Sequence, residues 1–169
     1  MSSSPPRTLH ADAHSDPSSP KDLLKLDLQL CFALYAASLA MTKVYKPLLA
    51  PLGLTYPQYL VMLLLWEQDD RTVNELGHLL QLDSGTLTPL LKRMASQGLL
   101  SRERDPLDER RVRLRLTEAG RQLKQSATDI PSTLACKVAL DHQELTDLRT
   151  QLHQLRQRLA TQDAPPRGD

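Results

Sequence analysis

Apolar residues near the start of the chain recur at intervals of three and four, which is the spacing of one face of an α-helix. This face consists of Leu26, Leu30, Ala33, Leu34, Ala37, Ala40, Met41 and Val44. The pattern predicts a long first helix. Pro47 and Pro51 must kink or end it, because proline lacks the amide hydrogen that an interior helical residue donates.

Three further segments carry residues that begin helices. Residues 55–58, Thr-Tyr-Pro-Gln, predict the start of a helix through Trp66, which is apolar nearly all round and therefore central and buried. Residues 72–75 have the spacing of a capping box and predict a short helix to about Leu80. Ser84 is expected to cap the next helix, with Pro89 in its second turn and irregular geometry at its start.

A charged hairpin is predicted next. Residues 99–104 and 111–116 alternate apolar and charged side chains on either side of a polar segment, residues 105–110. The fold class expected is therefore mainly α with a small β-hairpin. A short helix, a second helix and a hairpin in series form a winged helix-turn-helix, which we place at about residues 57–117.

The C-terminal part of the chain is again helical. A helix is expected to begin near residue 117 and to end or kink at Pro131, and Asp141 is expected to cap the last helix. The last helix carries a narrow stripe of Leu145, Leu148, Leu152, Leu155 and Leu159. The small winged module could not bury the flanking apolar faces alone. We therefore expect a homodimer, in which a second copy of the chain covers them. An intrachain core is the other interpretation of this stripe.

The expected domain limits follow from these elements. Residues 1–20 hold six serines and four prolines and predict a disordered leader, and residues 163–169 predict a tail. One domain is expected at 21–162, with dimerisation helices at about 22–50 and 118–162.

Composition excludes several classes of protein. Two cysteines cannot form a disulfide framework, and five scattered histidines give no zinc pattern. The longest apolar runs are too short to cross a membrane, and the N-terminus lacks the apolar core of a secretory signal. We therefore expect a cytoplasmic protein with no metal, no cofactor and no membrane contact.

The basic charge gathers at one place in the chain. The whole chain has a net charge of +1, but the segment 92–115 holds eight basic and four acidic residues and nets +4. A solvated hairpin with mixed charges is one interpretation. The position of the segment favours double-stranded DNA instead, because it covers the end of the candidate recognition helix and the hairpin.

The candidate DNA-binding residues divide by their expected place. Short hydroxyl side chains at the start of the recognition helix suit the major groove, and cations one to two turns later reach phosphates or a guanine edge. An arginine at the hairpin tip suits a narrow minor groove, where Asp108 is expected to orient the Arg110 guanidinium. The residues are Ser84, Thr86, Thr88, Lys92, Arg93, Asp108, Arg110 and Arg111.

Cys31 is the candidate for thiol chemistry. It is expected in the middle of the first helix among apolar residues, where it gains nothing from a helix N-terminus and where a small core residue is the plain interpretation. Tyr35 lies four residues later, on the same face, and Tyr45 and Tyr56 follow nearby. Cys136 is a second thiol, 105 positions away, which suits either core packing or condensation with an oxidised cysteine.

Two segments carry a family resemblance. Residues 28–67 contain LCFALYA and TYPQY, and residues 82–120 contain DSGTLTPLLKRM, DERRV and LTEAG. Over about residues 26–159 the chain resembles the organic hydroperoxide resistance regulators of the MarR family. The first pair of motifs is the more specific, because it places a cysteine where most MarR relatives have none.

The resemblance implies a homodimeric repressor, not an enzyme, that releases a palindromic operator when an organic hydroperoxide oxidises Cys31. It implies that Tyr45 and Tyr56 hydrogen-bond the sensing thiol across the dimer, and that Tyr35 lines the same pocket. It further implies that Cys136 is the resolving cysteine of the two-cysteine branch, forming a disulfide with the partner subunit. One alternative is a MarR-type repressor relieved by reversible binding of an aromatic or phenolic ligand. Another is a thiol peroxidase, which would have no use for the basic hairpin.

Overall fold

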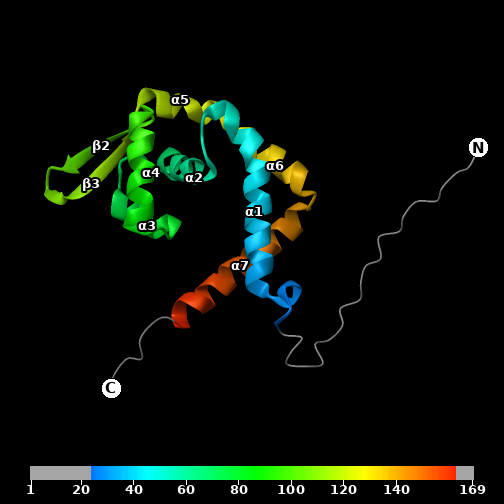
Figure 1. Ribbon diagram of the computed structural model, residues 1–169. Coiled ribbons are helices and arrows are strands. Elements are labelled where there is room, and N and C mark those ends of the chain that lie inside the picture. The colour runs from blue at the N-terminus through cyan, green and yellow to red at the C-terminus, as the bar shows by residue number, and fades with distance from the viewer. Residues whose placement is uncertain (1–23, 163–169) are drawn as a thin grey trace, which may run out of the picture. The chain divides into compact units, whose positions relative to one another are not determined.

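The computed structural model describes residues 24–162. The predicted leader, and the tail at 163–169, lie outside these residues. The chain divides into two units, one ending at Met41 and the other beginning at Thr42, and each is described by itself. Helix α1 (Leu30–Leu49) begins in the first unit and ends in the second (Figure 1).

The first unit contains a short 3-10 helix, η2 (Leu26–Leu28), and the N-terminal part of α1. Its large apolar side chains are exposed, among them Leu30, Phe32, Leu34 and Leu39. The predicted helix is present from Leu30, and its apolar face is exposed among the residues that the structure describes.

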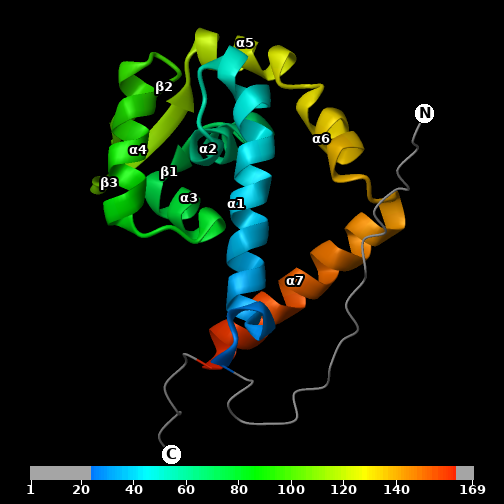
Figure 2. The ribbon, with the colours of Figure 1, turned by 45° about the vertical axis from the view of Figure 1, so that its right-hand side comes forward.

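The second unit opens with the end of α1 and with η3 (Ala50–Leu52), which leads into α2 (Tyr56–Glu67). Helix α1 ends two residues after Pro47, and Gly53 follows η3 with a left-handed backbone, φ 65°. Thr55 and Gln58 form a capping box at the start of α2. Residues on several sides of α2 are buried, as its sequence predicted, and Figures 1 and 2 show this helix at the centre of the winged module.

The helix-turn-helix consists of α3 (Val73–Leu80) and α4 (Ser84–Ser96). Thr72 and Glu75 form the predicted capping box of α3. The predicted cap of α4 is wrong by one residue, since Asp83 accepts the hydrogen bond of the Thr86 amide at 2.9 Å. A carboxylate one residue before the expected serine satisfies the same amide, which leaves Ser84 as the first helical residue.

The sheet has three antiparallel strands in the order β1-β3-β2: β1 (Arg71–Thr72), β2 (Leu100–Asp105) and β3 (Asp108–Leu116). The predicted hairpin is confirmed, with a tighter turn than expected, because β2 and β3 pair as far as Asp105 and Asp108. We call this hairpin the wing. Strand β1 was not predicted, since two residues are too few to show a period. A mainly helical chain with this small sheet confirms the expected fold class.

The core of the second unit joins α2, α3, α4 and the sheet. Its fully buried residues include Met62, Leu76, Leu87, Leu91, Met94 and Leu114. Helix α5 (Glu118–Ser126) is capped by Thr117, whose side chain accepts the Gly120 amide. Gly120 lies directly against the Leu99 carbonyl, so no larger residue fits between α5 and the start of β2.

Two helices end the described chain, α6 (Ile130–Val138) and α7 (His142–Gln162). Pro131 is the second residue of α6. Asp141 caps α7, because it accepts the Glu144 amide while its own amide donates to the Glu144 carboxylate, each at 2.8 Å. The leucine stripe of α7 is partly exposed, with Leu148, Leu152 and Leu159 at 46%, 42% and 56%.

Among the described residues, no single helix is long and apolar enough to cross a membrane. Residues Leu30–Leu52 and Tyr56–Glu67 pass that test only as a bent pair, by length and composition.

Candidate DNA interface and candidate thiol site

Helix α4 separates its apolar and polar residues cleanly. Leu87, Leu91 and Met94 are buried at helical spacing, which turns the opposite side of the helix to solvent. The predicted DNA-binding residues of α4 lie on the solvent side: Ser84, Thr86, Lys92 and Arg93 are exposed, and Thr88 is partly exposed. The Thr86 hydroxyl also donates to Asp83 at 2.9 Å, so the capping carboxylate belongs to this surface.

The wing divides its arginines between its two faces, because side chains alternate along a strand. Arg113 and Arg115 lie on one face, beside Glu103 and Asp105 of β2. Both bind Asp70, with the Nε atoms of Arg113 and Arg115 at 2.8 and 3.1 Å from its carboxylate. These hydrogen bonds hold the pKa of the Asp70 carboxyl far below its usual range, so it stays charged.

Asp108 does not orient Arg110 as predicted. Its Oδ2 atom lies 3.2 Å from the Nε of Arg111, and its Oδ1 atom accepts the main-chain amide of Arg110 at 3.1 Å. The carboxylate folds back over the chain as in an Asx turn, and this geometry points it toward the second arginine after it. Arg110 itself is exposed at the tip of the wing.

Five cations of the basic segment remain free of any salt bridge within residues 24–162. They are Lys92, Arg93, Arg102, Arg104 and Arg110. Arg102 and Arg104 share a face of β2, and the Nε of Arg102 is buried without a hydrogen-bond partner. Neither was chosen as a DNA-binding residue from the sequence. Strand alternation was the signal that could have identified them. It was not sufficient, because one of the acids that neutralise the opposite face of the wing is Asp70, which lies outside the basic segment.

The comparisons with known proteins decide the family. A family model described as transcriptional regulator SarA/Rot matches residues 43–127. The chain is 53% identical over 134 residues to the organic hydroperoxide resistance transcriptional regulator of Bacillus subtilis (strain 168), which covers 79% of this chain and 91% of that protein. The chain belongs to the organic hydroperoxide resistance regulators of the MarR family.

Solved structures agree with this assignment. Reduced AbfR bound to DNA has a TM-score of 0.70 and 35% identity, covering 82% of this chain and 95% of AbfR. AbfR with a disulfide formed matches with a TM-score of 0.57 and 36% identity, covering 80% and 95%. A mutant MarR from E. coli complexed with operator DNA has a TM-score of 0.69 and 26% identity, covering 75% and 92%. Members of this family are DNA-binding transcriptional regulators, not enzymes.

The thiol of Cys31 in this organic hydroperoxide regulator is exposed, and it lies at the second residue of α1. The expected place in the middle of the helix is therefore wrong, because the helix begins at Leu30 rather than near residue 22. Tyr35 follows one turn later in the first unit and is exposed.

The other predicted tyrosines of the regulator form a cluster in the second unit. The rings of Tyr45 and Tyr56 lie 4.6 Å apart between centroids, and those of Tyr45 and Tyr59 lie 5.8 Å apart. Burial raises the pKa of the Tyr45 phenol to about 12, and the neighbouring Tyr56 and Tyr59 phenols add to this rise. These phenols therefore keep their protons at neutral pH and are available as hydrogen-bond donors.

A cavity of about 380 Å³ adjoins this cluster. It is lined by Thr42, Lys46, Leu49, Ala50, Leu54, Thr55, Tyr56 and Pro57. Its wall is mostly apolar, with the Lys46 side chain as its one cation among the described lining residues. Cys136, the second predicted thiol, is exposed near the end of α6.

Proposed function

We propose that this regulator is a cytoplasmic, homodimeric repressor that binds a palindromic operator and releases it when an organic hydroperoxide oxidises Cys31. The observation that carries the proposal is the combination of an exposed thiol in the first turn of α1 with a winged helix-turn-helix whose solvent side is basic. A DNA-binding protein has no need of an exposed thiol, and a peroxidase has no need of a recognition helix and wing.

The proposed chemistry needs two steps. The Cys31 thiolate attacks one oxygen of the hydroperoxide, the O–O bond breaks, and the organic alcohol leaves after taking up a proton. The sulfenic acid so formed then meets the Cys136 thiol of the partner subunit, the S–S bond forms, and water leaves. The peroxide is the two-electron oxidant, and the two thiols together supply the electrons.

The tyrosine cluster suits the first step. We infer that Tyr45 and Tyr56 donate hydrogen bonds to the Cys31 sulfur in the dimer and that Tyr35 lines the same pocket. Protonated phenols in apolar surroundings stabilise a thiolate without quenching it by proton transfer, since the pKa of Tyr45 is raised to about 12. The leucines beside this cluster favour an alkyl or acyl peroxide over hydrogen peroxide.

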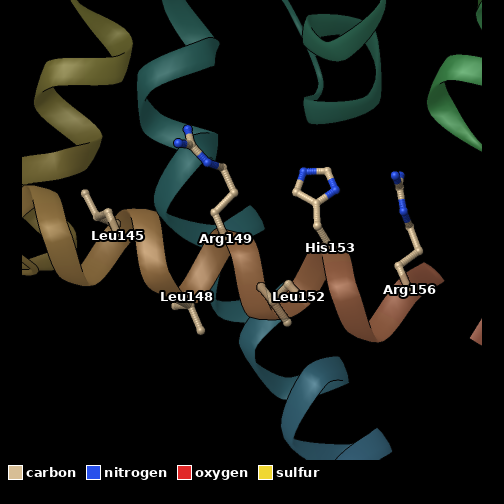
Figure 3. Close-up of a pocket in the computed structure, with 6 residues that line it drawn as sticks. All are labelled: Leu145, Leu148, Arg149, Leu152, His153 and Arg156. Atoms are coloured by element: carbon tan, nitrogen blue, oxygen red, sulfur yellow. The ribbon is translucent and has the colours of Figure 1, made fainter. Parts of the chain in front are cut away.

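Exposed apolar surface supports the homodimer. The first unit and α7 both leave leucines in solvent, which a second copy of the chain would cover. Along α7 an open cavity of about 540 Å³ is lined by Leu145, Leu148, Arg149, Leu152, His153 and Arg156. Figure 3 shows the side chains of Arg149, His153 and Arg156 pointing to one edge of this face of α7, and those of Leu148 and Leu152 pointing to the other edge. We therefore expect the leucines of α7 to contact the second copy of the chain, and the three cations to lie at the edge of that interface.

The DNA-binding surface of the proposal is the solvent side of α4 together with the tip of the wing. Replacing Arg110 by alanine is expected to weaken operator binding by about 1–3 kcal/mol, because a guanidinium inserted in a narrow minor groove is lost. The measurement is operator titration by fluorescence anisotropy at fixed salt. Arg158→Ala serves as the matched control, since Arg158 is an exposed arginine of α7, outside both α4 and the wing. Equal affinities for wild type and Arg110→Ala would assign the wing tip to solvent.

The function as a whole is tested with the wild-type protein and operator DNA. Reduced protein is expected to bind, and protein treated with cumene hydroperoxide is expected to dissociate and to bind again after reduction by dithiothreitol. The same titration with hydrogen peroxide measures selectivity. Retention of the operator by fully oxidised protein would contradict the proposal.

The 380 Å³ cavity favours one alternative function, relief by a reversible aromatic or phenolic ligand. The same assay separates the two, because a reversible ligand acts on reduced protein in thiol buffer and leaves both cysteines unmodified by mass.

A further inference from the structure

Asp70 is the centre of the ion-pair cluster on one face of the wing. It lies in the loop between α2 and β1 and has a left-handed backbone, φ 62°. Its carboxylate binds Arg113 and Arg115, and its carbonyl oxygen accepts a further hydrogen bond from Arg113 Nη2 at 3.0 Å. One loop residue thus holds two arginines of β3 through both its side chain and its main chain.

The contacts continue from Asp70 to the tip of the wing. Arg113 also binds Asp105, with Nη1 and Oδ2 at 3.1 Å, and Asp105 is the last residue of β2. The other carboxylate oxygen of Asp105 accepts the amide of Leu107 in the turn, at 3.0 Å. Asp105 is buried, with 6% of its surface exposed, while the Arg113 side chain that binds it is 30% exposed. A continuous path therefore runs from the loop through Arg113 to the wing turn.

The same loop is attached to the rest of the module. Asp69 accepts the amide of Leu116 at 2.8 Å, at the other end of β3, and binds Arg121 of α5 at 3.2 Å. Two residues after Asp70, the Thr72 capping box starts α3. The loop therefore connects the base of the helix-turn-helix to both ends of the wing.

We propose that Asp70 is a positioning residue for operator binding. It fixes the wing relative to α4 so that Arg110 reaches the minor groove while α4 lies in the major groove. The proposal rests on the proposed DNA-binding surface. Asp70 would touch no DNA itself and would act through Arg113, Asp105 and the wing turn.

For removal of the Asp70 carboxylate, charge alone and positioning of the wing predict opposite effects on DNA binding. Asp70 is a negative charge beside a surface that meets phosphates, and it occupies two arginines. If electrostatics were its only influence, removing the carboxylate would release cations and strengthen binding to DNA. If Asp70 positions the wing, removing it must weaken binding in spite of the added positive charge.

The test is Asp70→Asn in the full-length protein. Asparagine tolerates the left-handed backbone and keeps the carbonyl contact with Arg113, so only the charge and the second acceptor oxygen are lost. Operator affinity is expected to fall about tenfold, within the range expected for the loss of Arg110 itself. Arg113→Lys is the second variant, which keeps the charge but loses the guanidinium fork, and it is expected to weaken binding as well. Asp129→Asn is the matched control, because it makes the same change at an exposed aspartate before α6, outside the wing and the 69–70 loop.

A double-mutant cycle with Arg110→Ala identifies the route. Asp70→Asn is expected to have little further effect once Arg110 is absent, since both act through the wing tip. Urea unfolding is measured in parallel, and titrations are made where each variant is folded. Unchanged or tighter binding by Asp70→Asn, or effects that simply add in the cycle, would overturn the proposal. A neutral Arg110→Ala variant would instead contradict the wing assignment of the proposed function, whatever Asp70→Asn does.

Discussion

A protein in which Cys31 is replaced by serine is expected to bind the operator with wild-type affinity and to remain bound in organic hydroperoxide. Serine has nearly the same shape, so the fold and the DNA surface are preserved. Its hydroxyl is not oxidised by a peroxide, and no sulfenic acid or disulfide forms. The expected loss of the peroxide response is complete, measured as the fraction of operator bound before and after treatment with cumene hydroperoxide.

Cys136→Ser is the matched control for this experiment. Its Cys31 is still oxidised, but no intersubunit disulfide forms, so the covalent dimer seen on a non-reducing gel of oxidised wild type is expected to be missing. Normal release of the operator by Cys31→Ser would remove Cys31 from the mechanism. A treated wild type that stays entirely monomeric on the gel would leave Cys31 as the sensor and exclude the intersubunit disulfide.

Replacing Gly120 by alanine is expected to destabilise the winged module by about 2–3 kcal/mol. An added Cβ would overlap the main-chain carbonyl oxygen of Leu99 and press on the Leu116 side chain. Main-chain atoms cannot move aside without disturbing the pairing of Leu100 with Leu116 at the base of the wing. The Gly120 carbonyl also accepts the Trp66 indole N–H at 2.9 Å, so a shift of α5 strains a second contact.

Urea unfolding followed by circular dichroism measures this loss. Gly85→Ala is the comparison, because its added Cβ meets only the capping carboxylate of Asp83, at 3.0 Å, and no main-chain atom, and because alanine favours the helix. Gly120→Ala is therefore expected to unfold at clearly lower urea than Gly85→Ala. Equal midpoints would mean that α5 moves away from Leu99 without cost.

Local signals in the sequence were sufficient to predict most of the helices and strands. Capping residues at Thr55, Thr72 and Asp141 located three helices, and strand alternation located the wing, because these patterns act within a few residues of the chain. The start of α4 was missed by one residue, since aspartate and serine are both good caps and stand side by side.

The arrangement of the wing's charges could not be predicted in the same way. Asp70 is more than 40 positions from Arg113 and Arg115, which it binds, and nothing in the local sequence pattern pairs them. The place of Cys31 was missed for a similar reason. The apolar periodicity extends back to Leu26, but the α-helix begins only at Leu30, after a 3-10 turn.

The division of the wing's arginines also bears on the ion atmosphere of DNA. A protein displaces condensed counterions from the duplex only with cations that are free to meet phosphates. Arg111, Arg113 and Arg115 already share their charge with carboxylates of the same chain. The arginine-rich sequence of the wing therefore overstates the entropy that this protein gains from counterion release, and a larger share of its affinity must come from the fit between protein and groove.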